Sequence, residues 1–513
     1  MLWAQTHRTS ARLGFLLQAG TRVLTAILSL IWTKWLLGAM GTPLYGLFVS
    51  FNAIASLGSL GDLGLGGAIS LKTSELLAEG KEAALQKFLA NARGLFVLLS
   101  SAVALAFLLG SSWLPQALRF ESVPGAGSIP LLFACGAIGA SFIVLNSYIA
   151  NVNYACGNLM WSVVPAFLIL QASLAGHWLL ARQGSPLWIQ SLPYFAATAA
   201  LHGMWWCYLR VSHPGLAEVR PLRFDGRTLG PLVRQSFWVY FYCLGGSICA
   251  VTDRLLVNAS FGAAAVPAYT LNYKLCELSL FVIGAASYAS MPKIALWVLS
   301  AEETLRARAR TEITKLGKFQ TLFGASAALA YLFINDWFVT LWLGADFLVP
   351  LNLQVAFAAN LAVTACGYAG FELTARSGPH GLRYGALTVG VAAVLNLGLS
   401  LVAVRFGHAA GIAWATVVAQ SVLILACGRY SYRYLGLSWK GLVLRNWVCC
   451  LLLVGLVWLV RWQFPLNSPA HLAVALVTSA ILIRGLMYGI GFRLRDLHNE
   501  MAVVRSLFQK RQP

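Results

Sequence analysis

The chain alternates long apolar stretches with short polar ones that are mostly basic. A window of about 19 residues finds fourteen stretches long enough for helices that cross a bilayer core about 30 Å thick. This pattern predicts an all-α polytopic membrane protein with about 14 transmembrane helices. The expected spans are 13–37, 44–69, 94–114, 129–150, 161–180, 193–209, 236–257, 266–291, 320–341, 351–370, 386–405, 409–428, 446–462 and 470–490.

Composition supports this class and excludes two others. Hydrophobic residues make up 59% of the 513 positions and charged residues only 11%, against roughly a quarter charged in a soluble domain. A soluble enzyme and a disordered chain are therefore excluded. The first stretch is too long for a cleavable signal and contains Arg22 and Lys34, so we expect it to remain as the first helix.

Chemistry-bearing residues are sparse. The ten cysteines lie in or beside apolar stretches without CxxC or Cys/His spacing, and the eight histidines form no HExxH pattern. No GxSxG motif and no nucleotide-binding domain occur. We therefore expect no catalytic residues, no cofactor and no metal site.

The basic residues predict the topology. Of the 37 Lys and Arg residues, 28 fall on the side of the N-terminus, four on the other side and five within spans. The positive-inside rule then places both termini in the cytoplasm, and it accounts for the net charge of +20 without nucleic acid as a partner. The basic segments 71–93 and 292–319 also carry apolar residues at helical spacing. We expect solvated connectors there, with surface helices as the alternative.

One internal repeat is visible. Residues 32–37, followed by Gly41 and Tyr45, are similar to residues 252–256, followed by Gly262 and Tyr269. The separation of about 220 residues corresponds to six spans, so the two copies would be parallel repeats.

Charged residues inside predicted spans are hypotheses for functional sites, because burying a charge in a membrane is costly. Arg22 lies near the middle of its span and is the strongest candidate. With Lys34, Arg254 and Lys274 it would form a cationic cavity suited to phosphate or pyrophosphate. Acidic candidates for ion coupling are Asp62, Asp253, Glu277 and Glu372.

Each candidate also has a structural interpretation. Lys274 and Glu277 are spaced i,i+3 and would neutralise each other as an ion pair. Lys34 and Arg254 lie near the outer ends of their spans, within reach of water, and Arg484 lies near an inner end. The acidic residues would equally serve as ion-pair partners or helix caps.

The glycine-rich segment 58–67 has neither a preceding strand nor a GK[ST] sequence, so it is not a phosphate-binding loop. Close helix packing or a hinge explains its glycines.

Four short motifs are distributed along the chain. They are Gly61-Asp62-Leu63-Gly64-Leu65-Gly66 leading into 74–80, Thr252-Asp253-Arg254 with Gly262 and Tyr269, Leu341-Trp342-Leu343-Gly344 with Phe347, and Gly407 with Gly411-Ile412-Ala413. Together they resemble the motifs of the polysaccharide transporter, or Wzx-type flippase, family of the multidrug/oligosaccharidyl-lipid/polysaccharide (MOP) exporter superfamily. The resemblance extends over nearly the whole chain.

The resemblance implies two six-helix lobes around a central cavity, followed by two further helices. It divides the chain into an N-terminal lobe (1–210), a basic cytoplasmic linker (211–235), a C-terminal lobe (236–430) and a final part with the two extra helices and a basic tail (431–513). Spans 1, 2, 7 and 8 would form the substrate portal, and these are the spans that carry Arg22, Lys34, Asp62, Arg254 and Lys274.

The function implied is transfer of polyprenyl-pyrophosphate-linked oligosaccharides across the bacterial inner membrane by alternating access, for O-antigen or exopolysaccharide synthesis. Implied partners are a polysaccharide polymerase and a chain-length regulator. Lipid II flipping and multidrug/cation antiport, as in MATE-like proteins, remain alternatives. A membrane glycosyltransferase or polymerase and an assembly scaffold are alternatives from other classes, although no outer loop exceeds about 14 residues, too short to build an enzyme domain.

Overall fold

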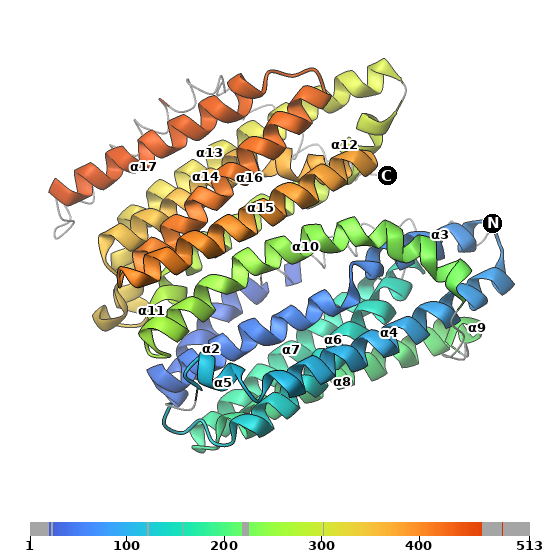
Figure 1. The fold of residues 1–513 in the computed structure, drawn as a ribbon, viewed down its shortest axis with the longest axis horizontal. Helices are drawn as coiled ribbons and strands as arrows, with labels where there is room; N and C mark the ends of the chain where they lie inside the picture. Colours follow the sequence, from blue (N-terminus) through green and yellow to red (C-terminus); the bar gives the residue numbers. More distant parts are fainter. Residues whose placement is uncertain are drawn as a thin grey trace, which may run out of the picture. The chain divides into compact units, whose positions relative to one another are not determined.

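The computed structural model describes residues 24–120, 123–156, 159–217, 225–300 and 302–463, together with Gly20, Thr21 and Gly485. Every regular element in these ranges is a helix (Figure 1). The chain divides into two compact units, unit 1 (Met1–Thr270) and unit 2 (Leu271–Pro513), and each is described by itself. The expected boundary at 211–235 between two lobes remains a prediction; residues 226–235 form the first turns of a helix.

The described part of unit 1 contains the helix Leu24–Met40 and continues through α10 into α11. Its elements are α2 (Thr42–Leu57), the 3-10 turn η1 (Gly58–Asp62), α3 (Leu65–Ala78), α4 (Glu82–Gly110), α5 (Leu114–Ala117), α6 (Ile129–Ala155), α7 (Leu159–Arg182), α8 (Leu187–Ser212), α9 (Pro214–Ala217) and α10 (Gly226–Phe261). The short helix α11 (Ala265–Asn272) contains the boundary between the units.

Unit 2 consists of longer helices joined by short turns. Its elements are α12 (Lys274–Leu299), α13 (Glu303–Trp342), the 3-10 turn η3 (Ala345–Phe347), α14 (Leu351–Arg376), α15 (Gly378–Arg405), α16 (Ala409–Tyr434), the π-helical turn η4 (Lys440–Leu444) and α17 (Arg445–Gln463).

The predicted spans are found where the hydropathy pattern puts them. The second to the thirteenth each coincide with a helix or with consecutive helices in the described ranges, and the described part of the first, from residue 24 on, is helical. Nine helical stretches among the described residues are long and apolar enough to cross a membrane by length and composition. The expected span 470–490 lies outside the described residues. The prediction of an all-α polytopic membrane fold is confirmed.

The expectation of solvated connectors at 71–93 and 292–319 is wrong, because the spans continue through them as helices. Only residues 79–81 separate α3 from α4, and α12 and α13 are equally close in sequence. The 40 residues of α13 correspond to about 60 Å at 1.5 Å per residue, twice the thickness of a bilayer core. Buried apolar residues on these extensions, such as Ile294 and Ile313, explain why they stay helical.

The two segments identified as a repeat have the same local geometry. Gly41 and Gly262 both adopt the left-handed backbone region, with φ of 75° and 86°. The amide of Gly41 donates to the carbonyl of Leu37 at 2.9 Å, and that of Gly262 donates to Asn258 at the same distance. Later helices follow the same spacing of about 220 residues: α6 and α14 begin at Ile129 and Leu351. This agreement supports the parallel repeat.

The core of unit 2 is built around α14, which packs against α12, α13, α15, α16 and α17 (Figure 1). Most of its residues are buried, and many are alanine or glycine, which allow neighbouring helices to approach closely. A Cβ on Gly367 would lie 1.9 Å from Cγ2 of Ile424 on α16. Peripheral helices such as α15 instead expose large apolar side chains, including Val391 and Val394, as contact with lipid requires.

Candidate functional site

The candidate residues fall into two groups. Lys34, Asp62, Asp253 and Arg254 belong to unit 1, whereas Lys274, Glu277 and Glu372 belong to unit 2. Arg22, the strongest candidate from the sequence, lies outside the described residues, as does Arg484.

Asp62 lies where the second span is interrupted. The helix changes to η1 at Gly58, and Leu63 and Gly64 then adopt left-handed backbone angles, with φ of 51° and 70°. The amide of Gly64 donates to Oδ1 of Asp62 at 2.9 Å, and Oγ of Ser147 on α6 donates to Oδ2 at 2.6 Å. The interruption therefore presents a half-buried carboxylate to α6.

Glycines make this approach to α6 feasible. A Cβ on Gly66 would lie 2.5 Å from Nδ2 of Asn151 and 2.8 Å from Oγ of Ser147, and a Cβ on Gly58 would lie 2.9 Å from Cβ of Ala140. The prediction of close packing by the glycine-rich segment is confirmed. The result is a polar cluster of Asp62, Ser147 and Asn151 inside unit 1.

On α10 the adjacent residues Asp253 and Arg254 have different surroundings. The hydroxyl of Tyr269 on α11 donates to Oδ2 of Asp253 at 3.1 Å. Arg254 is half-buried, and its guanidinium has no hydrogen-bond or ion-pair partner among the described residues. Arg254 is therefore a cation inside a span without a compensating carboxylate.

Lys34 has the corresponding position on the first helix. It precedes Gly41 by seven residues and Arg254 precedes Gly262 by eight, so each cation lies about 11–12 Å along its helix from the turn. The side chain of Lys34 is exposed and has no partner within the part of the chain that the structure describes.

The two copies of the repeat approach each other within unit 1, where α2 contacts the α10–α11 turn. A Cβ on Gly46 would lie 1.8 Å from the carbonyl oxygen of Ala263 and 3.1 Å from Cδ of Pro267, so α2 and the α10–α11 turn touch through backbone. Further along, a Cβ on Gly64 would lie 3.0 Å from the backbone nitrogen of Tyr240 on α10. The second span therefore packs against the turn that follows the seventh span at Gly46, and against the seventh span itself at Gly64.

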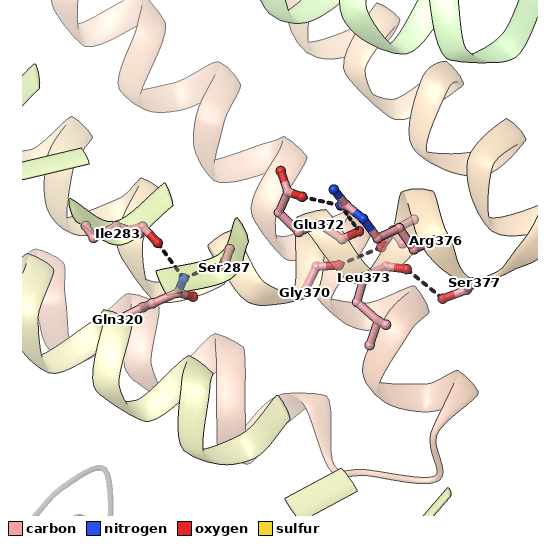
Figure 2. A network of polar contacts seen from close by, with 9 residues as sticks. Ile283, Ser287, Gln320, Gly370, Glu372, Leu373, Arg376 and Ser377 are labelled. Atoms are coloured by element: carbon pink, nitrogen blue, oxygen red, sulfur yellow. Dashed lines mark hydrogen bonds and ion pairs between the residues drawn. The ribbon is translucent and has the colours of Figure 1, made fainter. Parts of the chain in front are cut away.

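In unit 2 the candidates form local ion pairs. Nζ of Lys274 lies 2.9 Å from Oε2 of Glu277, with the side chains 19% and 46% exposed. Glu372 pairs with Arg376 one turn along α14, as Figure 2 shows. The ion-pair interpretation of Lys274 and Glu277 thus describes their geometry in this structure.

Polar side chains that the sequence analysis did not select also join helices in this unit. Nε2 of Gln320, which is fully buried on α13, donates to Oγ of Ser287 at 2.7 Å and to the carbonyl of Ile283 at 3.1 Å (Figure 2). The amide of Asn335 donates to Oδ1 of Asn272 at 3.0 Å. Isolated amides within apolar spans were the only sequence signal for these contacts.

A buried ion pair was also missed. The guanidinium of Arg461 on α17 donates to the carboxylate of Asp336 on α13 and to the carbonyl of Leu332. It also donates to Oε1 of Gln354 on α14 at 3.2 Å. The available signal was an acidic residue in the apolar span 320–341 and one of the few basic residues on the side opposite the N-terminus.

Comparison with known proteins identifies the class of fold. No family model and no curated protein matches the sequence. The structure is similar to the inward-facing conformation of a multidrug resistance MATE family transporter of the MOP superfamily, with a TM-score of 0.59 and 13% identity over 82% of this chain and 98% of that chain. The chain therefore has the polytopic all-α fold of that structure.

Two further structures define the fold more narrowly. The lipid II flippase MurJ in an inward closed conformation matches with a TM-score of 0.60 and 14% identity over 92% of this chain and 98% of that chain. A MOP superfamily transporter from Pyrococcus furiosus matches with a TM-score of 0.51 and 13% identity over 84% of this chain and 95% of that chain. The chain therefore shares the all-α polytopic fold of these three structures.

Proposed function

We propose that the protein is a flippase that transfers polyprenyl-pyrophosphate-linked oligosaccharides from the cytoplasmic to the outer leaflet of the bacterial inner membrane by alternating access. The fold supports a transporter of this superfamily. The excess of basic residues on one side supports both termini in the cytoplasm. The proposal includes two six-helix lobes around a central cavity, followed by two further helices.

Arg254 is the observation that carries the proposal. Its guanidinium is half-buried near the outer end of a membrane-spanning helix, and no carboxylate contacts it among the described residues, so it is available to an anion. A pyrophosphate offers the oxygens that a guanidinium binds in a bidentate manner. Lys34 at a similar distance from its turn, together with Arg22 and Lys274, completes the proposed substrate-binding set.

The proposed movement also fits the repeat. The second span contacts the α10–α11 turn at Gly46 and the seventh span at Gly64, and these contacts would separate when the carrier changes between its inward-open and outward-open states. Asp62, Asp253, Glu277 and Glu372 are the proposed sites at which an ion gradient drives that change. Asp62 has the most suitable surroundings, because its carboxylate lies at an interruption of the helix.

Lipid II flipping is the second candidate function. The observation in its favour is the similarity to MurJ, which covers 92% of this chain. Lipid II also has a polyprenyl pyrophosphate, so the same cations would bind it. The two substrates differ in the group attached to the polyprenyl pyrophosphate.

The proposal is tested by flipping in proteoliposomes. Protein-dependent transfer of a labelled polyprenyl-pyrophosphate oligosaccharide is measured for the wild type and for Arg254→Ala and Arg22→Ala. We expect both variants to lose transfer, whereas Arg405→Ala, which removes an exposed arginine at the end of α15, should retain it. Equal transfer by all variants contradicts the cationic site, and transfer of lipid II alone supports the second candidate.

A further inference from the structure

The basic segments of the molecule differ in how their charges are balanced. In unit 1, Lys72 lies 2.6 Å from Glu75 and Lys87 lies 3.0 Å from Asp225. In unit 2, Arg310 lies 2.7 Å from Glu303 and Lys315 lies 3.2 Å from Glu312 on the extension of α13. These cations have local carboxylate partners.

The region around the end of α16 has no such balance. The sequence contains no acidic residue between Glu372 and Asp496, and Glu372 is paired with Arg376 (Figure 2). Four exposed cations in this region make no ion pair within the described ranges: Arg429, Arg433, Lys440 and Arg445. We call these four residues the α16 basic patch.

The chain fold brings the patch together. After α16 ends at Tyr434, the chain turns at Gly436, whose φ is 70°, and continues into η4. Val443 of η4 packs onto α16, because a Cβ on Gly428 would lie 2.9 Å from its Cγ2. The cations on either side of the turn therefore lie at the same end of α16.

Aromatic rings stiffen this end. The rings of Tyr384 and Tyr430 are 4.7 Å apart and nearly parallel at 17°, and Tyr434 follows Tyr430 at 6.3 Å and 8°. The hydroxyl of Tyr384 also donates to the carbonyl of Ala426 at 3.4 Å. Tyrosine is enriched at the boundary between membrane and water, which is where the end of a spanning helix lies.

From this arrangement we propose that the α16 basic patch binds the phosphates of anionic phospholipids in the adjacent leaflet. Arg429 and Arg433 are spaced i,i+4, so their like charges repel unless an anion lies between them. Guanidinium groups bind phosphate oxygens in a bidentate manner, and clustered cations next to a spanning helix are attracted to anionic lipid surfaces. Because the patch is an exposed surface with several separate cations, it suits lipid headgroups of the bilayer. This inference goes beyond the proposed function and does not depend on the transported substrate.

The test measures which lipids the full-length protein retains. The protein is reconstituted in nanodiscs of phosphatidylcholine and phosphatidylglycerol, extracted in detergent, and its bound lipids are counted by native mass spectrometry. We expect the wild type to retain phosphatidylglycerol in preference to phosphatidylcholine. Arg429→Gln/Arg433→Gln/Lys440→Gln should weaken that preference by about 10-fold to 100-fold, since each cation near an anionic surface contributes severalfold in affinity.

Two control variants distinguish the loss of cations in the α16 basic patch from the loss of cations elsewhere in the protein. Lys72→Gln/Lys87→Gln/Lys315→Gln removes three cations that have carboxylate partners and should retain the preference. Arg429→Lys/Arg433→Lys keeps the charge and should retain most of it, which also covers the case in which the triple variant fails to fold. Loss in both triple variants, or in neither, overturns the proposal.

A competition arm separates two sources of lipid phosphate. A polyprenyl pyrophosphate is added to the wild type at a concentration equal to that of phosphatidylglycerol. Retention of phosphatidylglycerol supports the proposal. Complete displacement of phosphatidylglycerol from the wild type by the polyprenyl pyrophosphate assigns the patch to the transported lipid and overturns the proposal.

Discussion

The guanidinium of Arg461 donates a hydrogen bond to the carboxylate of Asp336, and this ion pair joins α17 to α13. The two partners differ in exposure, since the side chain of Arg461 is 7% exposed and that of Asp336 is 41% exposed. Gln354 holds the pair from α14, because its Nε2 donates to Oδ1 of Asp336 at 2.7 Å. Three helices of unit 2 therefore meet at one buried cation.

This difference in exposure predicts unequal effects of the two single substitutions. Asp336→Ala leaves a buried guanidinium without its carboxylate and should destabilise the protein by about 2–4 kcal/mol. Arg461→Met leaves a carboxylate that is already partly exposed, so it should cost less. The measurement is thermal unfolding in detergent. Arg461→Met/Asp336→Ala should be more stable than Asp336→Ala alone, and an additive loss would contradict the ion-pair account.

The second prediction concerns Gly46, where α2 packs against the α10–α11 turn. Gly46→Ala would place a methyl group against the carbonyl oxygen of Ala263, at 1.8 Å before any shift, and should destabilise the protein by about 3 kcal/mol. The matched control is Gly67→Ala on α3, where nothing lies within 4 Å and stability should be unchanged or slightly higher. Both are compared by thermal unfolding, and equal stability of the two variants would show that this contact can relax.

The span positions could be predicted because each depends on about 20 neighbouring residues, and apolar length alone determines them. The same window failed at 71–93 and 292–319. It registers only apolar content, whereas the helices continue there as amphipathic segments with residues such as Ile313 buried.

Polar contacts were likewise predictable only where the partners are close in sequence. The pair between Lys274 and Glu277 follows from i,i+3 spacing, and the sequence was sufficient to propose it. Asp336 and Arg461 are 125 residues apart, and Asp62 and Ser147 are 85 apart. Helix packing brings such partners into contact, and packing depends on all the side chains between the helices rather than on local spacing.

The third prediction is that substitution of Asp62 affects ion coupling and leaves folding unchanged. In Asp62→Asn the amide oxygen can still accept from the backbone of Gly64, and the amide nitrogen can donate to Ser147, so the helix interruption should persist. The charge is lost. We expect normal thermal unfolding but transport that no longer responds to a proton or sodium gradient, measured in proteoliposomes with the gradient imposed or collapsed. Asp253→Asn serves as the comparison, and an unchanged response in Asp62→Asn would assign coupling to another acidic residue.

Lys274 and Glu277 provide the last prediction, which separates an ion pair from a substrate ligand. Lys274→Gln alone leaves Glu277 without its partner, so its loss of transport would fit either role. Lys274→Gln/Glu277→Gln removes both charges together and leaves no unpaired group. If Lys274 only neutralises Glu277, the double variant transports at a rate within about threefold of the wild type, since a neutral pair of similar size replaces a charged one at little cost. The substrate-binding role proposed for Lys274 instead predicts a double variant as inactive as Lys274→Gln, and this is the outcome we expect, because the 2.9 Å contact leaves the other Nζ protons free to bind a phosphate. The measurement is initial flipping rate against substrate concentration, and a double variant within about threefold of the wild type would remove Lys274 from the proposed substrate-binding set.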